Sequence, residues 1–297
     1  MGYLFVVIAA IAAGGQFSLS KVYKRLVPSS DFSDLFYNFA TGLFSVVIFA
    51  IICRGQVGFT AFSFWLAAGV AVCNTIYTIC GLKAVMSGKL AVFTAFLMLG
   101  GMVFPTVYGV IFLHEKMSVF KIAGVAILIF SMLFSLTEKT EEKKNTTIFY
   151  VLCLIAFVCN GFVSVFSKMH QIGAEALDTY QFSFWQSVVV AVAVGGILAG
   201  YALVNQKKEN SIPIVRKVLS GKSFGLILLV TVIMRAGSVL LLFAAKDVPA
   251  SALYPFMTGL SILVTAIFGR IFFKEKISRV NVVTLTANIV AVVLMIF

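Results

Sequence analysis

Ten apolar runs, separated by short polar or charged segments, are the most regular feature of this chain. The runs cover residues 2–20, 34–53, 59–80, 90–113, 118–136, 148–167, 179–204, 223–245, 250–273 and 279–297. A helix needs about 20 predominantly apolar residues to cross the hydrocarbon core of a bilayer. The pattern therefore predicts an all-α integral membrane protein with ten transmembrane helices. No basic residues precede the first run, so we interpret it as a retained span rather than a signal peptide.

The composition agrees with this prediction and excludes a water-soluble fold. Of the 297 residues, 61% are hydrophobic and only 11% are charged, whereas about a quarter of the residues of soluble proteins are charged. The net charge is +12, but the Lys and Arg residues lie in the gaps between the runs and form no contiguous basic face. We therefore expect the lipid bilayer as a partner and no nucleic acid.

Cysteine and histidine residues show no pattern that is typical of a metal site or a cofactor. The five cysteines lie within or at the edges of apolar runs and form no CxxC motif, so we expect them to pack as small apolar side chains. His114 and His170 fall in predicted loops, without the neighbours that a metal ligand or a general base needs. We predict no metal site and no cofactor.

The two halves of the chain resemble each other at an offset of 160 residues. Residues 110–118 (VIFLHEKMS) lie over residues 270–278 (RIFFKEKIS), and the pattern Glu-Lys-x-Ser recurs intact. Residues 137–147 form the one strongly charged linker, which is too polar to enter a membrane. We therefore predict two five-helix repeats, at residues 1–136 and 148–297.

Each predicted repeat holds an odd number of helices, so the second repeat must enter the membrane from the side opposite to the first. Such inverted repeats occur in many secondary carriers, which alternate access around a site near the bilayer midplane. Channels contain inverted repeats as well. The arrangement favours a carrier without excluding a channel.

These features together resemble those of a known family, and the resemblance covers the whole chain. The five-plus-five pattern, the Glu-Lys-x-Ser turns at 115–118 and 275–278, and prolines Pro105 and Pro255 in the helices before those turns are together similar to the drug/metabolite transporter superfamily, in particular its EamA-like members. The resemblance implies a central cavity lined by the first four helices of each repeat. It also implies that the protein exports or imports small organic solutes.

The sequence departs from the family pattern at the two turns. A glycine commonly precedes the turn glutamate in similar proteins, whereas His114 and Lys274 occupy these positions here. We interpret Ser118 and Ser278 as N-caps of the helices that follow. On this interpretation, the adjacent Glu and Lys side chains are solvated at the membrane interface.

Arg235 is the outstanding polar residue within an apolar run. It lies near the middle of residues 223–245, too far from either end for its side chain to reach the interface, and all eleven carboxylates fall in loops or at helix ends. One interpretation is that Arg235 binds a carboxylate or phosphate of the substrate through two parallel hydrogen bonds. The alternative is a structural arginine that bonds backbone carbonyls at a broken helix.

Other polar residues share helix faces within the runs. Tyr254, Thr258, Ser261 and Thr265 follow one another at spacings of 4, 3 and 4, which places them on one face. The candidate substrate-binding residues are Arg235, Asn160, Ser164, Tyr254, Thr258, Ser261, Asn74, Thr78, Gln16 and Asn38. Close packing of membrane helices is the competing interpretation for the Ser and Thr positions, and for the amides to a lesser degree. Tyr77, Tyr180 and Trp185 fit either substrate stacking or an interfacial aromatic belt.

The function favoured by these residues is that of a secondary transporter of a small polar metabolite with an anionic group, such as an amino acid or an organic acid. Transport of sugar phosphates or nucleotide sugars, and a channel or lipid-handling scaffold, are the alternatives. Away from their ends, the predicted spans contain no His, Asp or Glu, which argues against an intramembrane enzyme and against proton-coupled antiport of cationic drugs.

Charge also predicts an orientation. Loops on the side of the termini hold five basic residues, Arg54, Lys116, Lys121, Lys168 and Lys246, whereas seventeen lie on the opposite side. Cytoplasmic loops carry the excess of Lys and Arg, so we predict that both termini face away from the cytoplasm, although similar proteins usually show the reverse. We expect a bacterial inner or plasma membrane. The sequence leaves homodimer formation open.

Overall fold

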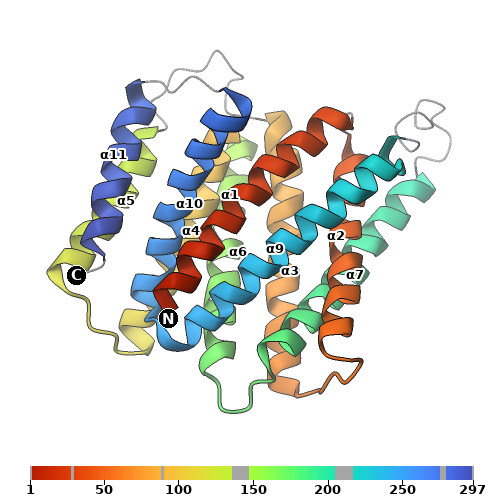
Figure 1. Cartoon of the computed structure of the whole chain (residues 1–297), viewed down its shortest axis with the longest axis horizontal. Coiled ribbons are helices and arrows are strands. Elements are labelled where there is room, and N and C mark those ends of the chain that lie inside the picture. The colour runs from red at the N-terminus through yellow and green to blue at the C-terminus, as the bar shows by residue number, and fades with distance from the viewer. Residues whose placement is uncertain are drawn as a thin grey trace.

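Ten helices account for most of the residues that this computed structural model describes, which are 2–27, 30–87, 90–135, 147–204, 217–274 and 279–295. The helices are α1 (Gly2–Leu26), α2 (Asp31–Ile52), α3 (Ala61–Ser87), α4 (Leu90–Phe112), α5 (Val119–Ser135), α6 (Thr147–Ile172), α7 (Thr179–Val204), α9 (Gly221–Asp247), α10 (Ala250–Phe273) and α11 (Arg279–Leu294). They run side by side as one bundle (Figure 1). Glu275, Ser278 and most of the predicted linker lie outside the described residues.

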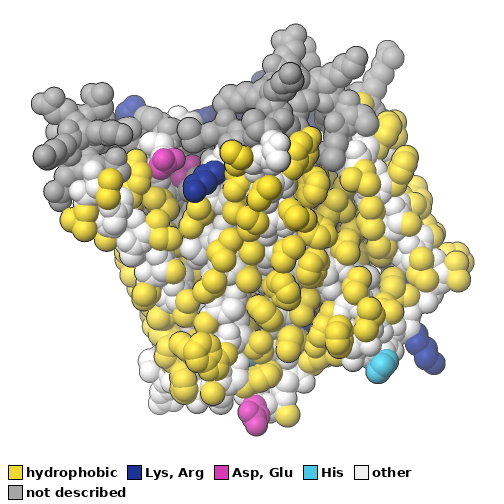
Figure 2. Space-filling model, turned by 180° about the vertical axis from the view of Figure 1, so that it is seen from behind, with side chains coloured by type: hydrophobic (Ala, Val, Ile, Leu, Met, Phe, Trp, Pro, Cys, Tyr) yellow, Lys and Arg dark blue, Asp and Glu magenta, His cyan; other side chains and the backbone are white. Residues whose placement is uncertain are grey.

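The bundle has the surface of a membrane protein. Eight helices are long and apolar enough to cross a bilayer, and α5 and α11 are shorter apolar helices. Figure 2 shows one face covered by hydrophobic side chains, with the charged side chains confined to its upper and lower margins. The prediction of a helical, multi-pass integral membrane protein is therefore confirmed.

The two ends of the bundle differ in which loops they carry. The N-terminus and the loops at residues 53–60, 113–118, 173–178 and 248–249 lie at one end, which we call the N-terminal end (Figure 1). The C-terminus lies there as well. Segments that connect the helices at the opposite end fall largely outside the described residues.

Three helices continue beyond the apolar runs that predicted them. Predicted ends at residues 20, 80 and 167 stand before the first lysine, but α1 continues to Leu26, α3 to Ser87 and α6 to Ile172. The reason is that a lysine near a helix end can extend its ammonium toward water or bond the backbone of a neighbouring helix. His170 consequently lies in α6 and not in a loop, so that prediction was wrong.

Serine side chains act as N-caps at the start of several helices. Ser30 and Ser33 form a reciprocal capping box at the start of α2. Ser118 accepts a hydrogen bond from the Lys121 amide at the start of α5, which confirms it as an N-cap. Ser220 accepts in the same way from the Ser223 amide at the start of α9.

Packing distinguishes two groups of helices in the middle of the bundle, and these groups also contact each other through α4 and α10 and, less extensively, through α6 and α9. In one group, which we call the α6 group, α6 packs against α3 and α4; in the other, the α1 group, α1 packs against α9 and α10. A Cβ atom on Gly100 of α4 would overlap with the carbonyl of Phe157 in α6, and one on Gly14 of α1 would overlap with Val264 in α10. Each group is therefore held by close backbone approach, as is common in membranes.

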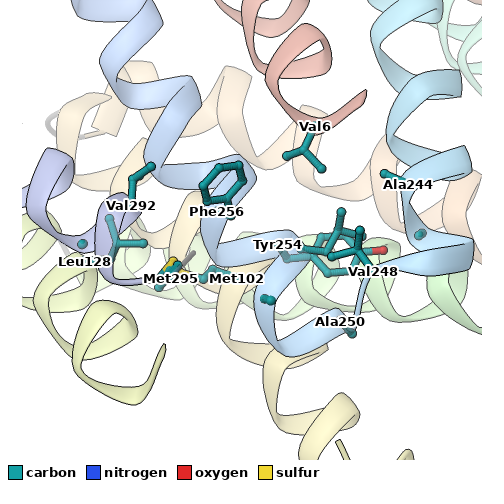
Figure 3. Close-up of a cluster of buried hydrophobic side chains, with 14 of the residues drawn as sticks. Val6, Met102, Leu128, Ala244, Val248, Ala250, Tyr254, Phe256, Val292 and Met295 are labelled. Atoms are coloured by element: carbon teal, nitrogen blue, oxygen red, sulfur yellow. The ribbon is translucent and has the colours of Figure 1, made fainter. Parts of the chain in front are cut away.

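The largest buried apolar cluster lies where α10 meets its neighbours. Val6 of α1, Met102 of α4, Leu128 of α5 and Met295 near the C-terminus surround Phe256 of α10 (Figure 3). These side chains are almost completely shielded. The cluster packs α10, which belongs to the α1 group, against α4 of the α6 group and against α5.

Aromatic side chains gather at the N-terminal end. Trp185 of α7 makes edge-on ring contacts with Phe59 and Phe64 and donates a hydrogen bond from Nε1 to the carbonyl of Gly58. Trp65 stacks edge-on against Phe64 and is largely exposed. Tryptophan is enriched where a bilayer meets water, so the position of this cluster at one end of the bundle is the one expected of an interfacial belt.

Candidate substrate-binding site

Arg235 is the charged residue farthest from the ends of its helix. It lies 14 residues after the start of α9 and 12 before its end, which is about 21 and 18 Å along the axis. The helix continues without a break through this position, and the side chain is half-buried. A structural arginine at a broken helix is therefore not what the structure shows.

One hydroxyl holds the Arg235 side chain in place. Its Nε donates to the Oγ of Ser45 in α2 at 2.5 Å, and Ser45 donates in turn to the carbonyl of Thr41 at 2.6 Å. The hydroxyl of Tyr77 in α3 is close enough to Arg235 to interact with it electrostatically. Arg235 thus lies among α2, α3 and α9.

The two terminal nitrogens of Arg235 remain available. In the part of the chain that the structure describes, neither Nη makes a hydrogen bond and no carboxylate forms an ion pair with the guanidinium. A charge at this depth is costly unless a partner compensates it. The free side of a guanidinium matches a carboxylate or a phosphate through two parallel hydrogen bonds.

Other half-buried polar groups lie on α3, whose Tyr77 is close to Arg235, and on α1, which packs against α9. On α3, Asn74 and Thr78 lie one turn apart beside Tyr77, and Gln16 of α1 follows Gly15, which faces Ile233 of α9. Within the described residues, the side chains of Gln16, Asn74 and Thr78 make no hydrogen bond. They can turn toward a ligand without breaking an existing contact.

The second half of the sequence matches the model of a known protein family. The EamA-like transporter family matches residues 147–297, which is just over half of the chain. The chain belongs to the EamA-like transporter family. It is a membrane transporter of small solutes.

The fold of the transporter also resembles a solved one. A crystal structure of another protein superposes with a TM-score of 0.72 at 13% sequence identity, and the match covers 97% of this chain and 95% of that one. At this identity the likeness shows the fold alone. No curated protein matches the sequence significantly.

Several of the residues predicted to bind substrate are instead occupied by helix contacts of the transporter. Asn160 of α6 donates from Nδ2 to the carbonyl of Leu97 in α4 at 2.8 Å. Asn38 donates to the carbonyl of Asp34 within α2. Tyr254 donates its hydroxyl hydrogen to the carbonyl of Ser164 at 2.8 Å. The bonds of Asn160 and Tyr254 hold helices together in this conformation, whereas the bond of Asn38 lies within one helix.

The polar residues that share one face of α10 also differ in how far they are buried or in contact with other helices. Tyr254 and Ser261 are buried and Thr258 is half-buried. Thr265 lies against Gly14 of α1, and its hydroxyl is buried without a partner among the described residues. This set of residues therefore faces α1 at one end and the interior of the transporter at the other, and Thr258 is its most available member.

Three polar residues of the transporter were not identified as important from sequence. Lys168 donates from Nζ to the carbonyls of Ala245 and Val248, at 2.7 and 2.9 Å. The carboxylate of Glu115 accepts the amide hydrogens of Ala250 and Ser251, at 2.7 and 2.8 Å. The prediction that Glu115 is solvated was wrong, because the start of α10 offers unpaired amides to it.

His170 is the third of these residues. Its ring stacks on Phe182, with centroids 3.6 Å apart, its Nε2 lies 3.0 Å from the hydroxyl of Ser63, and its Nδ1 lies 2.9 Å from Nε2 of Gln171. The sequence did not predict these contacts, because it placed His170 in a loop. Its contacts join α3, α6 and α7 at the N-terminal end of the transporter, so we assign it a structural role.

The repeat in the sequence is the signal that could have identified two of these residues. Ser-Lys closes both the first and the sixth apolar runs, at Lys21 and Lys168, and the turn glutamate recurs at 115 and 275. Residues retained in both halves of a duplicated chain mark positions with a shared role. The role itself could not be inferred from sequence, because it depends on which backbone groups these side chains contact in the fold.

Proposed function

We propose that this transporter carries a small solute with an anionic group, and that Arg235 binds that group. The observation that carries the proposal is a guanidinium near the middle of α9 that is anchored through Nε by Ser45, with both terminal nitrogens unpaired among the described residues. An anion from solution would compensate the charge that the protein leaves uncompensated. An amino acid or an organic acid is of the appropriate size.

Half-buried polar groups on other helices of the bundle support a small and polar ligand. Gln16, Asn74, Thr78 and Thr258 come from α1, α3 and α10 and are half-buried. Amides and hydroxyls both donate and accept hydrogen bonds. They suit the hydroxyl, amine or amide groups of a metabolite better than the surface of a lipophilic drug.

The packing of the helices supports transport by alternating access. The contacts of α1 with α9 and α10 have counterparts in the contacts of α6 with α3 and α4. Under the predicted repeat, α1 corresponds to α6, α9 corresponds to α3, and α10 corresponds to α4. We infer that the two repeats are inverted relative to each other and that two conformations of similar energy alternate around Arg235.

A thermal-shift screen tests the proposal. Purified protein is heated in detergent with potassium salts of amino acids, dicarboxylates, sugar phosphates and inorganic phosphate, with potassium chloride as the reference. A ligand present at 100 times its Kd stabilises the folded state by about 2.7 kcal/mol. Carboxylates and phosphates are compared in one screen because both fit a guanidinium.

The matched variants are Arg235→Lys and Arg54→Lys. We expect Arg235→Lys to fold and to lose most of the ligand-induced shift and most of the counter-flow of labelled ligand in vesicles, since a point charge does not replace a planar fork. Arg54→Lys, at the N-terminal end, should retain both. Full transport by Arg235→Ala would refute the proposed role, and counter-flow that does not saturate would indicate a channel.

A further inference from the structure

The turn between α9 and α10 is held by two charged side chains of opposite sign. The last carbonyls of a helix and the first amides of the next have no partner within their helices, and they carry partial negative and partial positive charge. Lys168 bonds the carbonyls of Ala245 and Val248. Glu115 bonds the amides of Ala250 and Ser251. Each charge therefore lies at the helix end that attracts it.

The chain around Glu115 is shaped for this contact. His114 has a positive φ of 52°, and the Glu115 amide bonds the carbonyl of Gly109 at 3.0 Å, which reverses the chain after α4. A Cβ atom on Gly109 would overlap with the Glu115 carboxylate and would lie 3.1 Å from the Ser251 amide. The missing side chain leaves the space that the carboxylate occupies.

Both charged residues belong to one group of helices and the turn belongs to the other. Lys168 is in α6 and Glu115 directly follows α4, so both are attached to the α6 group, although α4 itself also packs against α10. The turn joins α9 to α10, which pack against α1 in the α1 group. These four hydrogen bonds therefore connect the two groups at the N-terminal end.

A second polar contact lies one helical turn farther inside. Tyr254 is four residues after Ala250 on α10, and Ser164 is four residues before Lys168 on α6. The Tyr254 hydroxyl donates to the Ser164 carbonyl, and Figure 3 shows Tyr254 beside Val248 and Ala250 of the turn. Elsewhere α6 and α10 do not pack along their lengths. Polar contacts, which can separate and become hydrated, therefore join these two helices.

We propose that Lys168 and Glu115 form the gate at the N-terminal end, and that this end opens when both release the α9–α10 turn. This inference rests on the proposal of transport by alternating access. Once released, the carbonyls and amides of the turn are at the end of the bundle, where water can solvate them. The gate positions the α1 group and does not touch the substrate.

Cysteine labelling tests the gate without any substrate. The five native cysteines are replaced by serine or alanine, and Thr258→Cys introduces a reporter eight residues after Ala250, about 12 Å deeper along α10. A membrane-impermeant maleimide is added from the N-terminal side, in whole cells or in inverted vesicles according to orientation. Glu115→Gln and Lys168→Met should each raise the labelling rate about tenfold, because each removes charge-assisted hydrogen bonds of the closed state.

Matched controls separate opening from unfolding. Glu175→Gln and Lys116→Met change exposed charges at the same end and should leave labelling slow. Lys168→Arg retains a cation for the two carbonyls and should also stay slow. A Leu253→Cys reporter, which is completely buried, should remain unlabelled in every variant, whereas a purely structural role would expose both reporters together.

Glu115→Asp provides an alternative test of the gate if Glu115→Gln does not fold. It keeps the charge but is one methylene shorter, so it reaches one amide and not two, and its labelling rate should be intermediate. Equal labelling of Glu115→Asp, Lys168→Met and the two exposed controls would overturn the gate. The anion screen with Arg235→Lys is read separately, so failure of the binding proposal is distinguishable from failure of the gate.

Discussion

Lys168 and Arg235 are both cations within apolar helices, but their surroundings differ. Lys168 is 4% exposed and bonds two backbone carbonyls of the α9 end. Arg235 is half-buried and bonds one serine hydroxyl, with most of its five N–H donors unpaired among the described residues. A buried charge is stable when its hydrogen-bonding capacity is used within the protein. On the proposed function, unused hydrogen-bonding capacity, more than depth in the membrane, distinguishes a ligand-binding cation from a structural one.

Replacing each cation by methionine should produce the largest contrast. Lys168→Met removes the donor to two carbonyls and should lower the stability of the closed conformation by about 1.4 kcal/mol, the equivalent of the tenfold rise in labelling. Arg235→Met removes an uncompensated charge and should leave the stability unchanged or raise it. Thermal unfolding without ligand measures both. Equal losses in the two variants would invalidate the comparison.

The two amides Asn160 and Asn74 repeat the contrast on a smaller scale. Asn160→Leu breaks the hydrogen bond to Leu97 between α6 and α4 and should cost about 1 kcal/mol. Asn74→Leu breaks no hydrogen bond among the described residues, so unfolding should be unaffected while ligand affinity falls. The pair is measured by unfolding and by the ligand-induced shift. A stable Asn160→Leu protein that loses ligand binding would reverse the assignment.

Removing single tyrosine hydroxyls should have a smaller effect. Tyr254→Phe deletes the bond to Ser164 and should lower the stability by about 0.6 kcal/mol, the average for such bonds in membranes. Tyr77→Phe deletes a hydroxyl that makes no hydrogen bond with the residues that the structure describes, so its effect on unfolding should be close to zero. A larger loss for Tyr77→Phe would place Tyr77 among the structural residues.

The smallest expected effect is a gain. His114 adopts a left-handed conformation with φ of 52°, which is unfavourable for a residue with a Cβ atom. His114→Gly should raise the stability by about 0.5 kcal/mol without changing ligand binding. Lys116→Gly, two residues later, should not stabilise the protein. A destabilised His114→Gly variant would show that the imidazole makes a contribution beyond its backbone.

Hydrophobic pattern alone predicted the ten helices, because membrane depth imposes nearly the same length on each. It failed at the ends of α1, α3 and α6, where lysine was treated as a boundary although its long side chain can remain in a helix. His170 was placed in a loop for the same reason. The local pattern shows only the spacing of residues along one helix. These errors arose where contacts with a neighbouring helix allow a polar residue to remain helical.

Within the site, Arg235 was identified from sequence because a charge far from both ends of an apolar run needs an explanation. Glu115 was misinterpreted because its partners, Ala250 and Ser251, are more than 130 residues away. Asn160 and Asn74 have the same chemistry in the sequence, and only the structure shows which amide already has a partner. Hydrogen bonds between distant segments decide these roles, and a single sequence does not contain them.

The aromatic belt gives the protein a built-in optical probe. The chain contains two tryptophans, Trp65 and Trp185, and both lie in that cluster at the N-terminal end. Their emission depends on the polarity of the surroundings, so intrinsic fluorescence reports on one end of the bundle and is silent about the other. A change in emission on adding a ligand would therefore be a one-sided signal, obtained from the unmodified chain.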